Sequence, residues 1–224
     1  EKPFVPEDLS DRVHAVVRRA KAGQSADIIR AHDIEIDLKR RLVSRLAGRV
    51  PTTVEDPLLA RAAVALVVVP DPDALLLIRR AERPGDPWSG QMGLPGGRSS
   101  PADAGLLETA IRETHEEVGI SLLREELVGQ LDDVAPRSPH LPPLMVRPFL
   151  FVLSRRPVVT PNSEVAEHLW VEWASLAHPE SYRSHFIRLG ETVREFPAYH
   201  VSPIPVWGMT ERILAPLVAL LSRD

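Results

Sequence analysis

Three glutamates crowd one face of a short helical segment and could hold a divalent cation. Glu113, Glu116 and Glu117 stand at positions i, i+3 and i+4, a spacing that brings side chains together on a helix surface. Carboxylates so placed repel one another unless a cation lies among them. Mg²⁺ and similar hard cations prefer oxygen ligands such as these. Gly96-Gly97 precedes the segment, and glycine lets a backbone turn sharply and approach a ligand closely. The pattern indicates a metal-bound phosphate site, although an exposed helix with Glu–Arg pairs would show the same carboxylates.

The elements that must position these glutamates follow from hydrophobic spacing. Apolar side chains recur at three- and four-residue intervals from Leu107 to Val118, which predicts a helix with one buried face that ends at Gly119. A loop rich in glycine and proline, residues 83–98, precedes this helix. We expect two hairpins, one of strands at 62–69 and 74–79 and one of strands at 186–189 and 192–196. Further strands are expected at 126–132, 144–153 and 165–173. Helices are expected at 9–20, 36–47 and 209–221, the last kinked at Pro216. Strands around one central helix, with helices at both ends, favour an α/β or α+β sandwich.

Composition excludes several classes of function. The 224 residues suit one large domain, or one domain with an extension. With 27 Lys and Arg against 31 Asp and Glu, the chain lacks the basic footprint of a nucleic-acid binder. It contains no cysteine, which rules out thiol catalysis and cysteine-bound zinc and fits a reducing compartment. The longest apolar runs, 62–69 and 213–221, fall short of the ~20 residues of a membrane span. We therefore expect a cytoplasmic protein with no nucleic-acid or membrane partner.

The ordered string around the glutamates resembles the Nudix box, Gly-x5-Glu-x7-Arg-Glu-U-x-Glu-Glu-x-Gly-U, in which U is a bulky aliphatic residue. Its second half matches from Arg112 to Ile120, with Thr114 at one aliphatic position. In the first half Asp103 replaces Glu, and the interval to Arg112 is one residue longer; we expect Asp103 to cap the helix together with Ser100. The resemblance implies a Nudix-type α/β/α sandwich with a mixed sheet over residues 59–224, preceded by an N-terminal helical extension over residues 1–58.

Three further segments resemble the Nudix enzymes that split coenzyme A. They are Leu75-Leu76-Leu77-Ile78-Arg79-Arg80, Gly90-Gln91-Met92-Gly93-Leu94-Pro95-Gly96-Gly97 and Trp207-Gly208-Met209-Thr210. The sequence departs from that subgroup at Leu77, Arg80 and Leu94, and its loop from Arg79 to Gly90 is longer. The resemblance implies hydrolysis of coenzyme A or an acyl-CoA to 3′,5′-ADP and (acyl-)4′-phosphopantetheine. Two alternatives stay open: a Nudix hydrolase for ADP-ribose, a dinucleotide or a nucleoside triphosphate, and a Nudix-fold binding module without turnover.

The resemblance also assigns roles to individual residues. It implies that Mg²⁺ or Mn²⁺ is held by the carboxylates of Glu113, Glu116 and Glu117 and by the carbonyl of Gly97. Catalytic roles fall to Glu116, which would accept a proton from water, to Glu113, and to Arg112, which would orient a metal-binding glutamate. We expect Arg79, Arg80 and Arg98 to meet substrate phosphates, and Trp88 either to stack on a base or to anchor its loop. Glu164 is interpreted as an exposed turn residue. The expected partner is a small nucleoside diphosphate-linked molecule, and a homodimer stays open.

Overall fold

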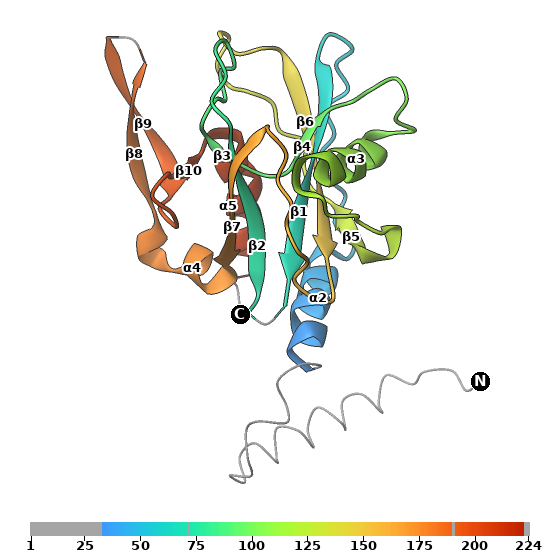
Figure 1. Cartoon of the computed structure of the whole chain (residues 1–224). Coiled ribbons are helices and arrows are strands. Elements are labelled where there is room, and N and C mark those ends of the chain that lie inside the picture. The colour runs from blue at the N-terminus through green and yellow to red at the C-terminus, as the bar shows by residue number, and fades with distance from the viewer. Residues whose placement is uncertain (1–32, 71, 190, 222–224) are drawn as a thin grey trace, which may run out of the picture.

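The computed structural model describes residues 33–70, 72–189 and 191–221, so the helix expected at 9–20 lies outside the described residues (Figure 1). Four α-helices, two single-turn 3-10 helices (Arg124–Glu126 and Pro179–Ser181) and ten strands are assigned within these ranges. The α-helices are α2 (Asp33–Leu46), α3 (Leu106–Val118), α4 (Trp173–Ala177) and α5 (Gly208–Leu221). The strands are β1 (Ala60–Val69), β2 (Ala74–Arg80), β3 (Met92–Gly93), β4 (Gly96–Arg98), β5 (Leu127–Gln130), β6 (Leu144–Val152), β7 (Val165–Glu172), β8 (Tyr182–Leu189), β9 (Thr192–Tyr199) and β10 (Val206–Trp207).

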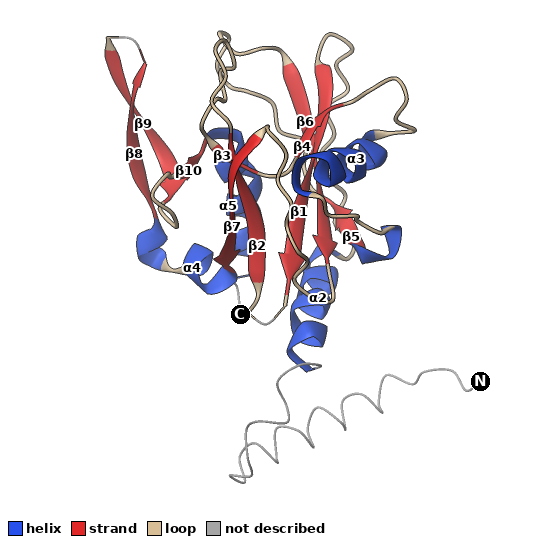
Figure 2. Ribbon diagram, in the orientation of Figure 1, coloured by secondary structure: helices blue, strands red, loops and turns tan. Residues whose placement is uncertain are grey.

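The described strands form a mixed sheet, as expected. Its main path runs β3-β2-β1-β6-β5, with β4 paired to β1 and β7 paired to β2. Strand β1 lies at the centre, antiparallel to β2 and β4 and parallel to β6, with Ala60 opposite Leu144 and Val68 opposite Val152. A second sheet of β10, β9 and β8 lies beside β7 (Figure 2). The expected hairpins are both confirmed, and the second is longer than its hydrophobic pattern showed because it runs from Tyr182 to Tyr199.

Helices cover both faces of the main sheet. Alternate side chains of a strand point to opposite faces, so Leu66 and Val68 of β1 pack with Leu214 of α5, whereas Ala65 and Val67 pack with Ala110 of α3. Figure 1 shows α3 on one face and α5 on the other. The architecture is therefore the α/β/α sandwich implied by the sequence resemblance.

Helix α2 shares the core on the α5 side. Its Leu42 is fully buried in the same apolar cluster as Leu214, and Arg41 Nη2 donates a hydrogen bond of 2.9 Å to the carbonyl of Leu221. The expected helix at 36–47 is confirmed, with its start three residues earlier. None of the helices in the described part of the chain is long and apolar enough to cross a membrane.

Helix α3 ends where the sequence predicts, but its start is capped differently. Gly119 closes it in the left-handed conformation, with φ of 71° and its N–H bonded to the carbonyl of His115, as expected. At the start, Gly105 is the capping residue, and no side chain caps the helix. The expectation that Asp103 caps α3 was wrong, because its carboxylate binds Arg112 and the N–H of Ser100 instead.

Candidate active site

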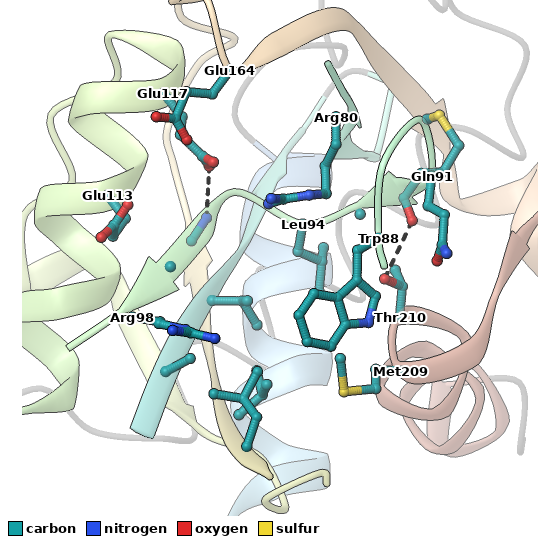
Figure 3. Close-up of a pocket in the computed structure, with 18 of the residues that line it drawn as sticks. Arg80, Trp88, Gln91, Leu94, Arg98, Glu113, Glu117, Glu164, Met209 and Thr210 are labelled. Atoms are coloured by element: carbon teal, nitrogen blue, oxygen red, sulfur yellow. Dashed lines mark hydrogen bonds between the residues drawn. The ribbon is translucent and has the colours of Figure 1, made fainter. Parts of the chain in front are cut away.

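A pocket of about 510 Å³ opens where β1, β4, α3 and α5 meet (Figure 3). One wall is acidic and carries Glu113, Glu116, Glu117 and Glu164. The opposite part is lined by apolar side chains and an indole: Leu94, Leu144, Val146, Met209, Ile213 and Trp88. Arg80 and Arg98 also line it. The pocket thus joins a charged end to an apolar end, as a diphosphate attached to an organic group requires.

The three glutamates of α3 are held at different depths. Glu117 is 3% exposed, and its Oε2 accepts a hydrogen bond of 2.8 Å from the N–H of Gly96 in β4. Glu113 is partly buried and Glu116 is exposed. The sequence therefore delivers one carboxylate to the base of the pocket and two toward its opening.

Arg112 organises the two outer glutamates. Its Nη1 donates hydrogen bonds to Glu113, at 2.8 Å, and to Glu116, at 3.0 Å. Its Nε and Nη2 bind the carboxylate of Asp103, and Nη2 also reaches the carbonyl of Arg98 at 3.2 Å. A planar guanidinium with several fixed donors suits such bridging. Arg112 therefore fixes the carboxylates of α3 relative to β4.

Burial and crowding disfavour negative charge on Glu117 and Glu113. Burial raises the pKa of Glu117 to about 7, and the charges of Glu113 and Glu164 act in the same direction, against the Gly96 N–H and Arg80. Burial likewise raises the pKa of Glu113, with further contributions from Glu116 and Glu164. A cation placed among these oxygens would relieve both effects.

The residues present fit a divalent cation. Hard cations take carboxylate and carbonyl oxygens, and Gly97 in β4 lies against Glu113: a Cβ built on Gly97 would lie 2.5 Å from the Glu113 carboxyl carbon. Only glycine thus lets the backbone of β4 and this carboxylate approach so closely. Among the described residues, no three acidic, histidine or cysteine side chains already converge as a metal-binding group. Gly96 and Arg112 bind the glutamate oxygens, so a cation would replace some of these hydrogen bonds.

The structure brings most of the expected substrate-binding residues into this pocket. Arg80, Arg98 and Trp88 line it. Arg98 is exposed and forms no ion pair with any residue in the described ranges. Arg79 is different, because its Nε binds Glu167 of β7 at 2.9 Å and it is not among the residues that line the pocket.

Several pocket residues were missed or underrated from the sequence. Glu164 is exposed, as expected of a turn residue, but it lines the acidic wall and pairs with Arg83 at 3.3 Å. It reaches the wall because the next residue, Val165, pairs with Arg80 of β2, a long-range pairing that no local pattern reveals. Asp86 and Gln91 also line the pocket, and only their position in the loop rich in glycine and proline could have suggested this.

Comparisons with known proteins agree with this geometry. A NUDIX domain profile matches residues 59–189. The chain is 31% identical over 190 residues to the mitochondrial coenzyme A diphosphatase NUDT8 of Mus musculus, covering 82% of this chain and 86% of that protein. It is 41% identical to an uncharacterized protein of Schizosaccharomyces pombe over 47% of this chain, and the match spans 34% of the length of that relative. Among solved structures, a MutT/nudix family protein from Enterococcus faecalis superposes with a TM-score of 0.52 at 17% identity, over 79% of this chain and 66% of that one.

Proposed function

The chain belongs to the Nudix family of pyrophosphohydrolases, and from that premise we propose that it hydrolyses coenzyme A or an acyl-CoA with the help of Mg²⁺ or Mn²⁺. The observation that carries the proposal is the acidic wall of the pocket. Four glutamates, Glu113, Glu116, Glu117 and Glu164, face a space that also holds Arg80 and Arg98. A phosphate cannot approach such an excess of carboxylates unless cations neutralise them.

In this proposal Glu113, Glu116 and Glu117 and the carbonyl of Gly97 hold the metal. When bound, a divalent cation neutralises phosphate oxygens and lowers the pKa of a coordinated water. Arg112 keeps Glu113 and Glu116 in place through Nη1. The two faces of α3 make the metal-binding site rigid: Ala110 and Val118 are buried against the sheet while the glutamates face the pocket.

Glu116 is our choice for the group that accepts the proton of the attacking water. It is the exposed member of the three glutamates, and a hydrogen bond of 3.0 Å from Arg112 holds its carboxylate at the opening of the pocket, where a water molecule can reach it. Water attacks one phosphorus of the diphosphate and the anhydride bond to the other phosphate breaks. No covalent bond to the protein forms in this scheme.

Coenzyme A is the proposed substrate for two reasons. The mouse relative, whose length this chain largely covers, bears the name coenzyme A diphosphatase. The pocket also combines its acidic wall with an apolar lining that an extended organic arm can contact. The products would be 3′,5′-ADP and 4′-phosphopantetheine, or the acyl form of the latter. The 3′-phosphate needs a cationic partner, and Arg98 is the candidate because Arg79, Arg80 and Arg83 already form ion pairs.

We also propose that substrate choice lies outside α3. The pocket is lined by Trp88 and Gln91 from the loop after β2, by Trp207 at the end of β10, and by Met209 and Thr210 at the start of α5. These segments surround the organic groups attached to the diphosphate, whereas α3 faces the diphosphate that all candidate substrates share.

A substrate panel tests the proposal. Coenzyme A, acetyl-CoA, 3′-dephospho-coenzyme A, ADP-ribose, diadenosine tetraphosphate and the nucleoside triphosphates are incubated with the protein and Mg²⁺ or Mn²⁺, and the products are identified by mass. We expect 3′,5′-ADP and 4′-phosphopantetheine from coenzyme A, slower cleavage of the dephospho form, and a loss of that preference in Arg98→Ala. Cleavage of ADP-ribose alone would refute the coenzyme A assignment while leaving the hydrolase assignment in place. No cleavage of any compound would refute both.

A further inference from the structure

Asp86 joins the end of β2 to the loop that follows it. Its Oδ2 accepts a hydrogen bond of 2.8 Å from Arg80 Nη2, and its Oδ1 accepts one of 3.0 Å from the backbone N–H of Trp88. The Asp86 side chain is 17% exposed. A carboxylate that is this enclosed and binds two donors at once holds both of them in place.

The loop around Trp88 is also attached to β2 at its far end, because the N–H of Arg80 donates a hydrogen bond of 3.0 Å to the carbonyl of Gln91 and the next residues, in β3, pair with β2. The N–H of Ser89 binds the carbonyl of Asp86 at 3.1 Å, and Gln91 Nε2 binds the carbonyl of Pro87 at 3.1 Å. Both contacts lie within the loop. The hydrogen bond between Arg80 and Asp86 adds a side-chain contact that ties the Trp88 segment to the end of β2, beside the acidic wall.

Trp88 forms part of the apolar end of the pocket. It packs against the core cluster that contains Leu94 and Ile213, and it lines the pocket together with Met209. Figure 3 shows the indole on the opposite side of the pocket from Glu113 and Glu117, with Arg80 between them. A flat, partly exposed aromatic surface at this place can contact a planar ring whose attached diphosphate lies at the acidic wall.

We infer that Asp86 is a positioning residue for substrate recognition: anchored by Arg80, it holds Trp88 where the indole packs against the planar ring of the substrate's nucleoside. The inference rests on the proposed function, because it takes a nucleoside diphosphate as the substrate. Asp86 itself does not touch the substrate in this arrangement. Its replacement should weaken binding of the ring and leave recognition of the diphosphate nearly unchanged.

The test measures the binding of two probes that share one part, a diphosphate analogue with a methylene bridge between its phosphorus atoms. α,β-Methylene-ADP carries the ring and a diphosphate analogue that cannot be hydrolysed, and methylenediphosphonate carries the bridge alone. Calorimetric titrations with Mg²⁺ compare the parent with Asp86→Asn, Trp88→Leu and the double variant. Asparagine keeps the size of the side chain and an acceptor for the Trp88 N–H but loses the charge that binds Arg80. Glu167→Gln is the matched control, because it breaks the Arg79–Glu167 ion pair at the neighbouring position of β2, outside the pocket.

We expect Asp86→Asn to weaken α,β-methylene-ADP about tenfold, or about 1.4 kcal/mol, and methylenediphosphonate less than about twofold. In the Trp88→Leu background the same change should have little further effect, because the two residues act through one contact. Glu167→Gln should bind both probes as the parent does. If Asp86→Asn fails to fold, judged by its melting temperature, Asp86→Ser takes its place.

Three results would overturn the inference: an Asp86→Asn variant that binds α,β-methylene-ADP like Glu167→Gln, equal losses for both probes, and additive effects of Asp86→Asn and Trp88→Leu. A parent protein that binds no α,β-methylene-ADP would overturn it as well. The proposed function is judged separately by turnover of the substrate panel, so either idea can fail alone.

Discussion

Asp103 and Arg112 form a two-point contact across nine positions of the chain, with Nε 2.8 Å from Oδ1 and Nη2 3.0 Å from Oδ2. Asp103 is 6% exposed at its side chain and also accepts a hydrogen bond from Thr109. The contact occupies one side of the guanidinium and leaves Nη1 for Glu113 and Glu116. The aspartate that departs from the Nudix box therefore supports the glutamates indirectly.

Asp103→Asn should weaken both stability and turnover. The Arg112 guanidinium lowers the pKa of Asp103 well below its ordinary value of 3.8, so the pair stabilises the fold above that pH and the contribution is lost as pH falls below it. We expect a loss of about 2 kcal/mol at pH 7, as for a charge-assisted hydrogen bond, and a kcat about tenfold lower, equivalent to about 1.4 kcal/mol. Urea unfolding at pH 7 and pH 3 checks the first effect; a difference between variant and parent that grows toward pH 3 would contradict it.

Glu113→Gln and Glu117→Gln should each abolish most turnover while the protein stays folded. Each change removes a charge from the acidic wall and leaves the side-chain volume nearly unchanged. A hundredfold loss of kcat corresponds to about 2.7 kcal/mol of transition-state stabilisation. Glu108→Gln is the control, since Glu108 lies on the same helix but pairs with Arg124 and does not line the pocket. Near-parent rates in both pocket variants would remove the metal-binding assignment.

The metal-free protein should lose stability as pH rises, through Glu117. Burial raises the pKa of this carboxyl from 4.5 to about 7, so the folded state favours the protonated form. The corresponding stability is complete below about pH 4.5 and is lost as pH rises through about 7. The shift corresponds to about 3 kcal/mol. Melting curves of the parent and Glu117→Gln in EDTA should diverge in favour of the variant between pH 5 and pH 8.

The same melting experiment with added Mg²⁺ or Mn²⁺ tests whether Glu117 binds the metal. The cation should raise the melting temperature of the parent more at pH 8 than at pH 5, because binding requires the ionised carboxylate. Glu117→Gln should gain much less at either pH. Equal gains in the parent and the variant would show that Glu117 does not bind the metal.

The adjacent glycines of β4 should respond differently to alanine. Gly96 has φ of 149°, and a Cβ there would overlap the carbonyl oxygen of Ala63 in the paired strand β1. Gly97 lies outside the left-handed region, and the three atoms nearest to its Cβ would all belong to the end of the Glu113 side chain. We expect Gly96→Ala to cost more than about 3 kcal/mol. Gly97→Ala should cost less than about 1 kcal/mol and lower kcat about tenfold. Denaturant titrations and initial rates separate the two outcomes.

The sequence predicted the parts of the site that depend on local spacing. Helix α3, its end at Gly119 and the shared face of its glutamates follow from a period of 3.6 residues and a terminal glycine. The contribution of Asp103 was misjudged because it depends on a side-chain contact with Arg112 outside the helical spacing, and that of Glu164 because it depends on the pairing of the distant strand β2.

The departures from the coenzyme A-type pattern illustrate the same limit. Arg80 and the longer loop after it were separate irregularities in the sequence. In the structure they are connected, because Arg80 binds Asp86 of that loop. A pairwise contact across a glycine- and proline-rich loop has no periodic signal, so only the folded chain reveals it.

The parallel pairing of β1 with β6 also constrains the order in which the sheet can form during synthesis. Strand β1 and helix α3 leave the ribosome well before Leu144–Val152, the segment that must lie beside β1. Until then β1 lacks the strand that pairs with it in parallel, and pairing between distant segments is slow to form. Strand β7, which begins next to Glu164, emerges later still. A nascent chain halted before β6 therefore carries every glutamate of α3 and yet lacks β6 and β7, which complete the sheet on both sides of β1 and β2, and the unpaired strand edges make this interval of synthesis prone to aggregation.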